Sequence, residues 1–217
     1  MTTRVYVELG AKRTFACALD WPGWARSAPR RAAMGDPDAE AAALEAFAGY
    51  LGRYASVVAA GTTGVEAPSV DRLEVVQRLP GDMTTDFGAP GSIPDVDSAP
   101  LPDGEAARLG QLLGACWTYL DAVAAAAPAE LRKGPRGGGR DRDAVVAHVI
   151  EAERSYLRKL GVSTGKAVAP ADWRAQLLDG LSGRRPVPIG SWPLRYLVRR
   201  TAWHVLDHAW EIEDRSQ

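Results

Sequence analysis

The sequence predicts an α+β protein, in which a small β-hairpin and helix domain is followed by a four-helix bundle. Strand-like alternation falls within residues 1–80, whereas helical periodicity dominates residues 103–217. Between them, residues 81–102 are rich in proline and glycine, which indicates a linker or a loop draped over another surface. A chain of 217 residues is long enough for one large domain or two small ones with an ample core.

The N-terminal domain is expected to begin with a hairpin. Residues 4–9 (RVYVEL) alternate and contain β-branched and aromatic side chains, and residues 14–19 (TFACAL) are expected to form the second strand. A turn signal at Pro22-Gly23 then breaks the pattern, and residues 26–37 are basic and irregular. Helical spacing of apolar residues predicts one helix over 38–58, and LEVVQRL (residues 73–79) indicates a third strand.

These N-terminal elements resemble a known small domain. The paired strands, the segment DWPGWARSA and the helix DAEAAALEAFAGYL are similar to the HicB-like antitoxin domain over about residues 4–58, with residues 26–37 as a departure. The resemblance implies a small α+β domain, and a generic hairpin–helix module is an equal interpretation. Pairing of this hairpin with a partner or a second copy would allow a homodimer.

Four helices are expected in the second half of the chain. Their ranges are roughly 105–127, 142–160, 170–181 and 191–213, with short to moderate connections typical of a four-helix bundle. The basic, glycine-rich segment 131–142 lacks the spacing of a phosphate-binding loop. It is interpreted as a flexible connector, and guidance of an anionic substrate is the alternative.

Composition narrows the functional class. The net charge of −1 argues against nucleic-acid binding, which needs a concentrated basic face. Cys17 and Cys116 form no CxxC motif, so a reducing, cytoplasmic setting is expected. The N-terminus does not resemble a signal peptide, and no apolar run is long enough to cross a membrane. The Ala, Gly and Arg content suggests a high-GC bacterial gene.

The three histidines of the chain fall at spacings that suit a metal site. His204 and His208 are four residues apart and therefore lie on one face of a helix, and His148 lies on another predicted helix. Three imidazoles can bind a divalent metal and leave a coordination position open. Helical phase places His208 in the buried stripe of the last helix and His204 at its edge. Three unrelated histidines on ordinary helices are the alternative.

The sequences around these histidines resemble a known superfamily. AHVIEAE around His148 and TAWHVLDHAWEIE around His204 and His208 are similar to the DinB/YfiT-like four-helix bundles, over about residues 103–217. These proteins include mycothiol- and bacillithiol-dependent transferases, maleylpyruvate isomerases, and members without a demonstrated activity. The resemblance implies that His148, His204 and His208 are metal ligands, most simply for Zn²⁺, with Ni²⁺ or Fe²⁺ as alternatives.

Charged residues near the histidines are candidates for supporting roles. HVLDH is not the zincin HExxH motif, because Val205 stands where that motif needs glutamate. Glu151 and Asp207 are candidates to orient an imidazole, and Glu151 is also a candidate general base. Arg200 is expected either to receive a substrate carboxylate or to form a salt bridge with Glu211 or another acid.

Three functions are therefore open. The leading hypothesis is a metal-dependent enzyme that transfers a low-molecular-weight thiol, mycothiol in a high-GC Gram-positive background, to a small electrophile; the thiol follows from the resemblance. Metal-assisted hydrolysis of a small molecule, with Glu151 as the base, is the second hypothesis. A non-catalytic metal-binding or interaction protein is the third. None of these hypotheses involves a membrane or a nucleic acid as a partner.

Overall fold

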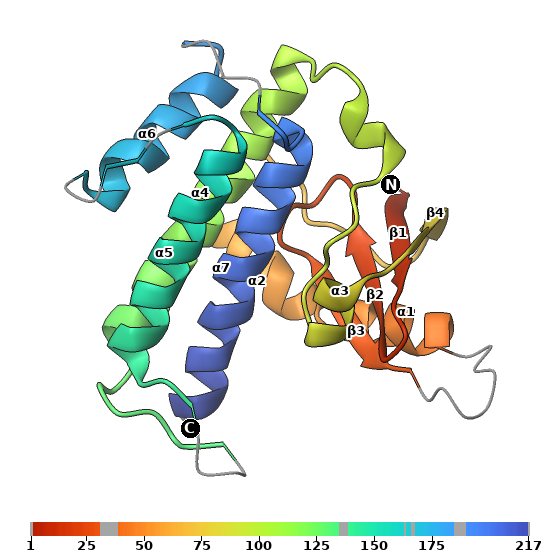
Figure 1. Ribbon diagram of the computed structural model, residues 1–217, viewed down its shortest axis with the longest axis horizontal. Coiled ribbons are helices and arrows are strands. Elements are labelled where there is room, and N and C mark those ends of the chain that lie inside the picture. The colour runs from red at the N-terminus through yellow and green to blue at the C-terminus, as the bar shows by residue number, and fades with distance from the viewer. Residues whose placement is uncertain are drawn as a thin grey trace. The chain divides into compact units, whose positions relative to one another are not determined.

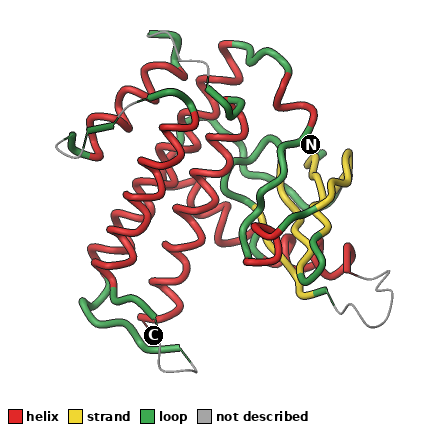
Figure 2. Tube along the Cα trace, viewed as in Figure 1, coloured by secondary structure: helices red, strands yellow, loops and turns green. Residues whose placement is uncertain are grey.

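The computed structural model divides into two compact units, Met1–Pro100 and Leu101–Gln217. The residues that it describes are 2–30, 39–134, 139–162, 164–165, 168–184 and 190–216. A sheet occupies the first unit and long helices the second, as Figure 2 shows by colour. The expected α+β class is therefore confirmed.

The sheet of the first unit has four strands in the order β3-β2-β1-β4. Their bounds are Thr3–Leu9 (β1), Arg13–Ala18 (β2), Ala25–Pro29 (β3) and Leu73–Pro80 (β4). Strands β1 and β2 form the expected antiparallel hairpin, whereas β4 runs parallel to β1 along its other edge (Figure 1). Strand β3 was not predicted, because residues 26–37 were expected to be irregular; the rest of that range, from residue 31, lies outside the described residues. This strand is short, ends in a proline and pairs only with β2, and proline is tolerated at such an edge.

The single helix expected over residues 38–58 is instead two helices, α1 (Ala39–Gly49) and α2 (Leu51–Gly61). The backbone carbonyl of Phe47 accepts a hydrogen bond of 2.9 Å from the indole Nε1 of Trp24. A continuous helix would direct this carbonyl to the N–H of Leu51, four residues on. The tertiary contact therefore favours the break, which also has glycine, a poor helix former, at Gly49 and Gly52 on either side.

Residues 81–100, expected within the linker 81–102, belong to the first unit. They form the short helix α3 (Met83–Phe87) and the 3-10 helix η2 (Asp95–Ser98). The buried carboxylate of Glu8 on β1 anchors them: it accepts hydrogen bonds from the backbone N–H groups of Gly91 and Ser92 and from the Thr85 hydroxyl. This segment therefore lies over the sheet. Of the two interpretations of its sequence, a linker or a loop over another surface, the second is the one observed for residues 81–100.

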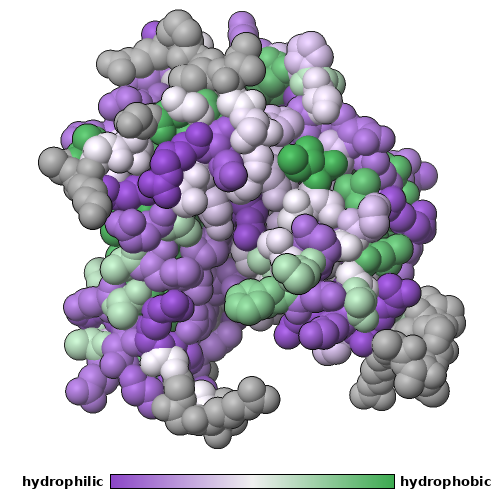
Figure 3. Space-filling view, in the orientation of Figure 1, coloured by the Kyte–Doolittle hydropathy of each residue, from purple (hydrophilic) through white to green (hydrophobic). Residues whose placement is uncertain are grey.

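Helix α3 also carries the most exposed large apolar side chains among the described residues. Met83 is 87% exposed and Phe87 93% exposed. Figure 3 shows hydrophobic atoms at the surface where Figure 1 places α3.

The second unit contains four helices in its described residues. Their bounds are Asp103–Ala126 (α4), Arg142–Lys159 (α5), Pro170–Leu181 (α6) and Leu194–Ser216 (α7). Helix α7 contacts both α4 and α5, and α4 also contacts α6 (Figure 1). Because it has neighbours on several sides, α7 buries residues around much of its circumference. Within the described residues, none of the helices combines the length and the apolarity needed to cross a membrane.

Candidate metal centre

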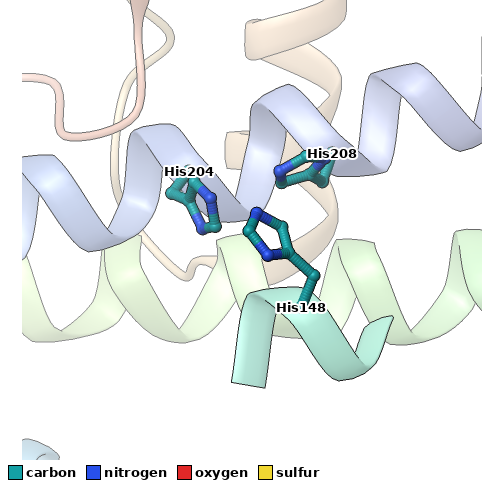
Figure 4. Close-up of side chains that lie close together, drawn as sticks. All are labelled: His148, His204 and His208. Atoms are coloured by element: carbon teal, nitrogen blue, oxygen red, sulfur yellow. The ribbon is translucent and has the colours of Figure 1, made fainter. Parts of the chain in front are cut away.

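The packing of α5 against α7 brings the three histidines of the chain together. His204 and His208 lie one turn apart on α7, and His148 reaches them from α5. Figure 4 shows the His148 ring pointing towards the space between the other two rings. One nitrogen of each imidazole can be chosen so that all three lie within 4.8 Å of one another. We refer to these residues as the three-histidine cluster.

The rings of the cluster are close but do not stack. Their centroids are 5.1 Å apart for His148 and His204, 5.0 Å for His148 and His208, and 4.6 Å for His204 and His208. The interplanar angles lie between 63° and 90°. Imidazole nitrogens bound to one tetrahedral zinc ion are roughly 3.3 Å apart. Small ring rotations would bring the nitrogens, now within 4.8 Å, to that spacing.

Burial keeps two members of the cluster, His204 and His148, unprotonated at neutral pH. Burial, assisted by the nearby His208, lowers the pKa of His204 to about 2. Burial is also the main cause that lowers the pKa of His148, followed by His208 and Arg140. A metal ligand must be the unprotonated imidazole. At neutral pH both imidazoles are therefore in the unprotonated form that can coordinate a metal ion.

The relative burial of the two histidines on α7 was predicted wrongly. His204 is buried, with 8% of its surface exposed, whereas 14% of the His208 side chain is exposed. The prediction used only the apolar stripe of α7 itself. In the folded unit the Tyr156 ring of α5 lies 5.8 Å from the His204 ring and the Trp203 ring lies 6.1 Å from it, so aromatic neighbours cover His204.

Glu211 orients His208, a half-buried member of the cluster. Its carboxylate Oε2 lies 2.7 Å from Nδ1 of His208, and its Oε1 accepts a hydrogen bond of 2.6 Å from Arg215. Because Nδ1 is engaged, Nε2 is the His208 nitrogen left for a ligand. The hydrogen bond from His208 is the main cause that lowers the pKa of Glu211.

Of the two residues expected to orient an imidazole, Glu151 makes a different contact, and the role of Asp207 stays a prediction. The Glu151 side chain is 73% exposed, and its carboxylate lies 3.6 Å from Nε of Arg154. Asp207 is partly buried on α7. Glu211 was expected to pair with Arg200, whereas its i+3 spacing from His208 could have indicated the observed contact.

Arg200 lies among aromatic side chains next to the cluster. Its guanidinium carbon is 4.7 Å from the ring centroid of Trp203 and 5.5 Å from that of Tyr156. Arg200 also contributes to the lowered pKa of His204, which indicates that its charge acts on the cluster. Among the salt bridges of the described residues, Glu211 pairs with Arg215 and His208, and none involves Arg200. The salt-bridge expectation for Arg200 and Glu211 is therefore wrong.

The residues of the cluster fit a divalent metal. Nδ1 of His204 is buried and has no hydrogen-bond partner among the described residues, which costs about 1–3 kcal/mol unless another group supplies the interaction. Three imidazoles form a donor set that suits Zn²⁺ and also Ni²⁺ or Fe²⁺. The cluster could therefore hold a metal ion.

A buried charge network on α5 was not predicted. Glu153 is buried, and its carboxylate accepts hydrogen bonds from the Trp117 indole on α4 and, at 2.8 Å, from Arg174 on α6. Burial raises the pKa of Glu153, against the opposing effect of Arg174. The four-residue spacing of buried Val149, Glu153 and Leu157 could have indicated its position. This network joins α4, α5 and α6. The three histidines lie in a different contact, between α5 and α7.

Neither a protein-family model nor any curated protein or solved structure matches this chain.

Proposed function

We propose that the chain is a metal-dependent enzyme of the DinB-like type, which transfers a low-molecular-weight thiol such as mycothiol to a small electrophile. The observation that carries the proposal is that three imidazole nitrogens lie within 4.8 Å of one another. They come from α5 and α7, which are separated in the sequence by α6 and its connections. The resemblance of the segments around these histidines to the DinB-like superfamily supplies the thiol chemistry.

In this proposal His148, His204 and His208 hold the metal, with Zn²⁺ as the favoured ion. A bound divalent metal lowers the pKa of a thiol or water molecule that coordinates it. Glu211 holds the His208 ring so that Nε2 faces the ligand position, while Arg215 fixes the Glu211 carboxylate. The aromatic side chains of Tyr156 and Trp203 exclude water from His204.

The thiol in this proposal comes from the co-substrate and not from the protein. Cys116 is buried in α4, and burial raises the pKa of its thiol, so it is protonated at neutral pH. Cys17 is buried in β2 of the first unit. Neither cysteine has the exposed, electropositive surroundings of a reactive thiolate.

The hydrolytic alternative has less support. It requires a general base beside the metal, and Glu151 was the residue expected in that role. Its carboxylate is largely exposed and contacts Arg154. The Glu151→Gln variant distinguishes the two functions. Hydrolysis with Glu151 as the base predicts that the variant binds metal but loses turnover, whereas thiol transfer predicts that turnover remains.

Isothermal titration of the zinc-loaded protein with mycothiol tests the proposal. Saturable heat with a stoichiometry near one per metal is expected, because the thiol occupies the open position. The His204→Ala variant, measured in parallel after the same metal treatment, is expected to show none. Absence of heat at millimolar thiol, with metal bound, would contradict thiol transfer.

A further inference from the structure

Arg200 has the properties of a binding group that lacks its ligand. It lies on α7 one turn before His204, so both residues share a helix face. Its Nη1 is buried and has no hydrogen-bond partner among the described residues. A buried donor without an acceptor is unfavourable, and for a charged group the penalty is larger than for a neutral one. An acceptor supplied by a ligand would remove it.

Two aromatic neighbours hold the Arg200 guanidinium in place, and one of them, Tyr156, also forms a side-chain hydrogen bond with it. Nη1 is the buried nitrogen that keeps no partner among the described residues. Trp203 and Tyr156 lie at 4.7 and 5.5 Å from the guanidinium carbon, distances typical of cation–π contacts. Such contacts engage the faces of the planar group, whereas its N–H donors point outward in the plane. Tyr156 contacts the His204 ring as well, so one side chain spans from the arginine to the three-histidine cluster.

The charge around the cluster also favours an anion. Arg200 on α7 and Arg140, before the start of α5, both act on His204 as positive charges. The nearby carboxylate of Glu211 is already bound by His208 and Arg215. A metal in the cluster would add further positive charge. A substrate with one negative group would balance this charge, and the fork of donors on arginine matches a carboxylate in geometry.

We propose that Arg200, held by Trp203 and Tyr156, is a subsite for the carboxylate of a small-molecule substrate whose reacting group lies at the three-histidine cluster. This inference rests on the proposed function and specifies the substrate class. Arg200 is the specificity residue of this subsite, and Tyr156 and Trp203 position it.

Calorimetric titration with benzoate, and with benzamide as its neutral counterpart, tests the subsite. The proteins are wild type, Arg200→Gln, Arg200→Lys and Arg158→Gln, an exposed arginine of α5 that serves as the matched control. Arg200→Gln is expected to weaken benzoate binding about ten- to a hundredfold, because charge-assisted hydrogen bonds are lost. Arg200→Lys should recover part of the affinity, since it keeps the charge but lacks the fork. Benzamide should bind weakly to all four proteins.

Zinc affinity and far-ultraviolet circular dichroism of each variant show whether the unit remains folded. Equal benzoate affinity in wild type and Arg200→Gln would overturn the subsite, and so would tighter binding of phenyl phosphate than of benzoate. The titrations are repeated with metal-free protein. Failure of wild type to bind zinc would overturn the proposed function. In that case, the difference in benzoate affinity between metal-free wild type and metal-free Arg200→Gln would still decide whether the subsite exists.

Discussion

Glu8 in the first unit and His204 in the second are both buried polar side chains, but their surroundings differ. The Glu8 carboxylate accepts hydrogen bonds from Thr85, Gly91 and Ser92. Nδ1 of His204 and Nη1 of Arg200, one turn before it, have no partner among the described residues. A buried polar group whose hydrogen bonds are complete fixes a fold, whereas one left incomplete is suited to a ligand. This difference supports a structural role for Glu8 and the proposed binding role of the three-histidine cluster.

Removal of Glu8 should give the largest change in stability. Glu8→Ala leaves two backbone N–H groups and one hydroxyl without their acceptor, so the free energy of unfolding should fall by about 3–5 kcal/mol. Urea denaturation measures this loss, and hydrogen exchange should locate it in residues 81–100. Glu66→Ala, an exposed position in the same unit, is the control. A loss of zinc binding in folded Glu8→Ala would contradict the separation of the two roles.

Glu211→Gln should have a smaller effect, and on metal affinity. The amide is a weaker hydrogen-bond acceptor for Nδ1 of His208 than the carboxylate is, so the ring is less firmly oriented. Zinc affinity should fall about 10- to 100-fold, as for other residues that orient a metal ligand. Competition with a chromophoric chelator measures it, with the exposed Glu130→Gln as the control. Unchanged affinity would show that Glu211 does not orient the ligand.

The stability of the metal-free protein should also depend on pH. In metal-free protein the pKa of His204 is lowered to about 2 and that of His148 is lowered as well, both mainly by burial. Below the unfolded pKa of about 6.5, the unfolded chain binds protons that the folded chain does not. The free energy of unfolding should therefore decrease as pH falls from 7 to 5, by at most about 1.4 kcal/mol per pH unit for each histidine.

Urea denaturation at several pH values, with a chelator present, measures this slope. The lowered pKa of Glu211 adds a further loss only at lower pH, where carboxylates begin to protonate. His204→Phe should make the slope shallower between pH 7 and 5. An identical slope in wild type and His204→Phe would mean that His204 is accessible to protons in the folded protein.

Local spacing was sufficient to predict the histidine cluster but not its surroundings. The i and i+4 positions of His204 and His208 place both on one helix face whatever surrounds it. The burial of His204 depends on the neighbouring Tyr156 of α5, which the phase of α7 alone cannot reveal. The break between α1 and α2 likewise depends on the hydrogen bond from Trp24 to Phe47, residues far apart in the sequence.

The side chain that orients His208 shows the same limit. Angular position on a helix favoured Glu151, which shares α5 with His148, but that carboxylate is largely exposed. Glu211 instead combines its i+3 spacing from His208 with a second contact, to Arg215, that holds its carboxylate in place. Glu151 and Asp207 were the residues expected in this role, and the contact of Glu211 with His208 appears only in the packed structure.

The metal content of the purified chain tests the central claim most directly. Wild type, His204→Ala and the control Glu130→Gln are reconstituted with Zn²⁺, passed through a desalting column and measured by elemental analysis. We predict about one equivalent of zinc in wild type and the control, and less than about a tenth in His204→Ala, because two imidazoles alone hold zinc weakly. Less than about a tenth of an equivalent in reconstituted wild type, or equal zinc in wild type and His204→Ala, would contradict the claim that the three histidines form a metal centre.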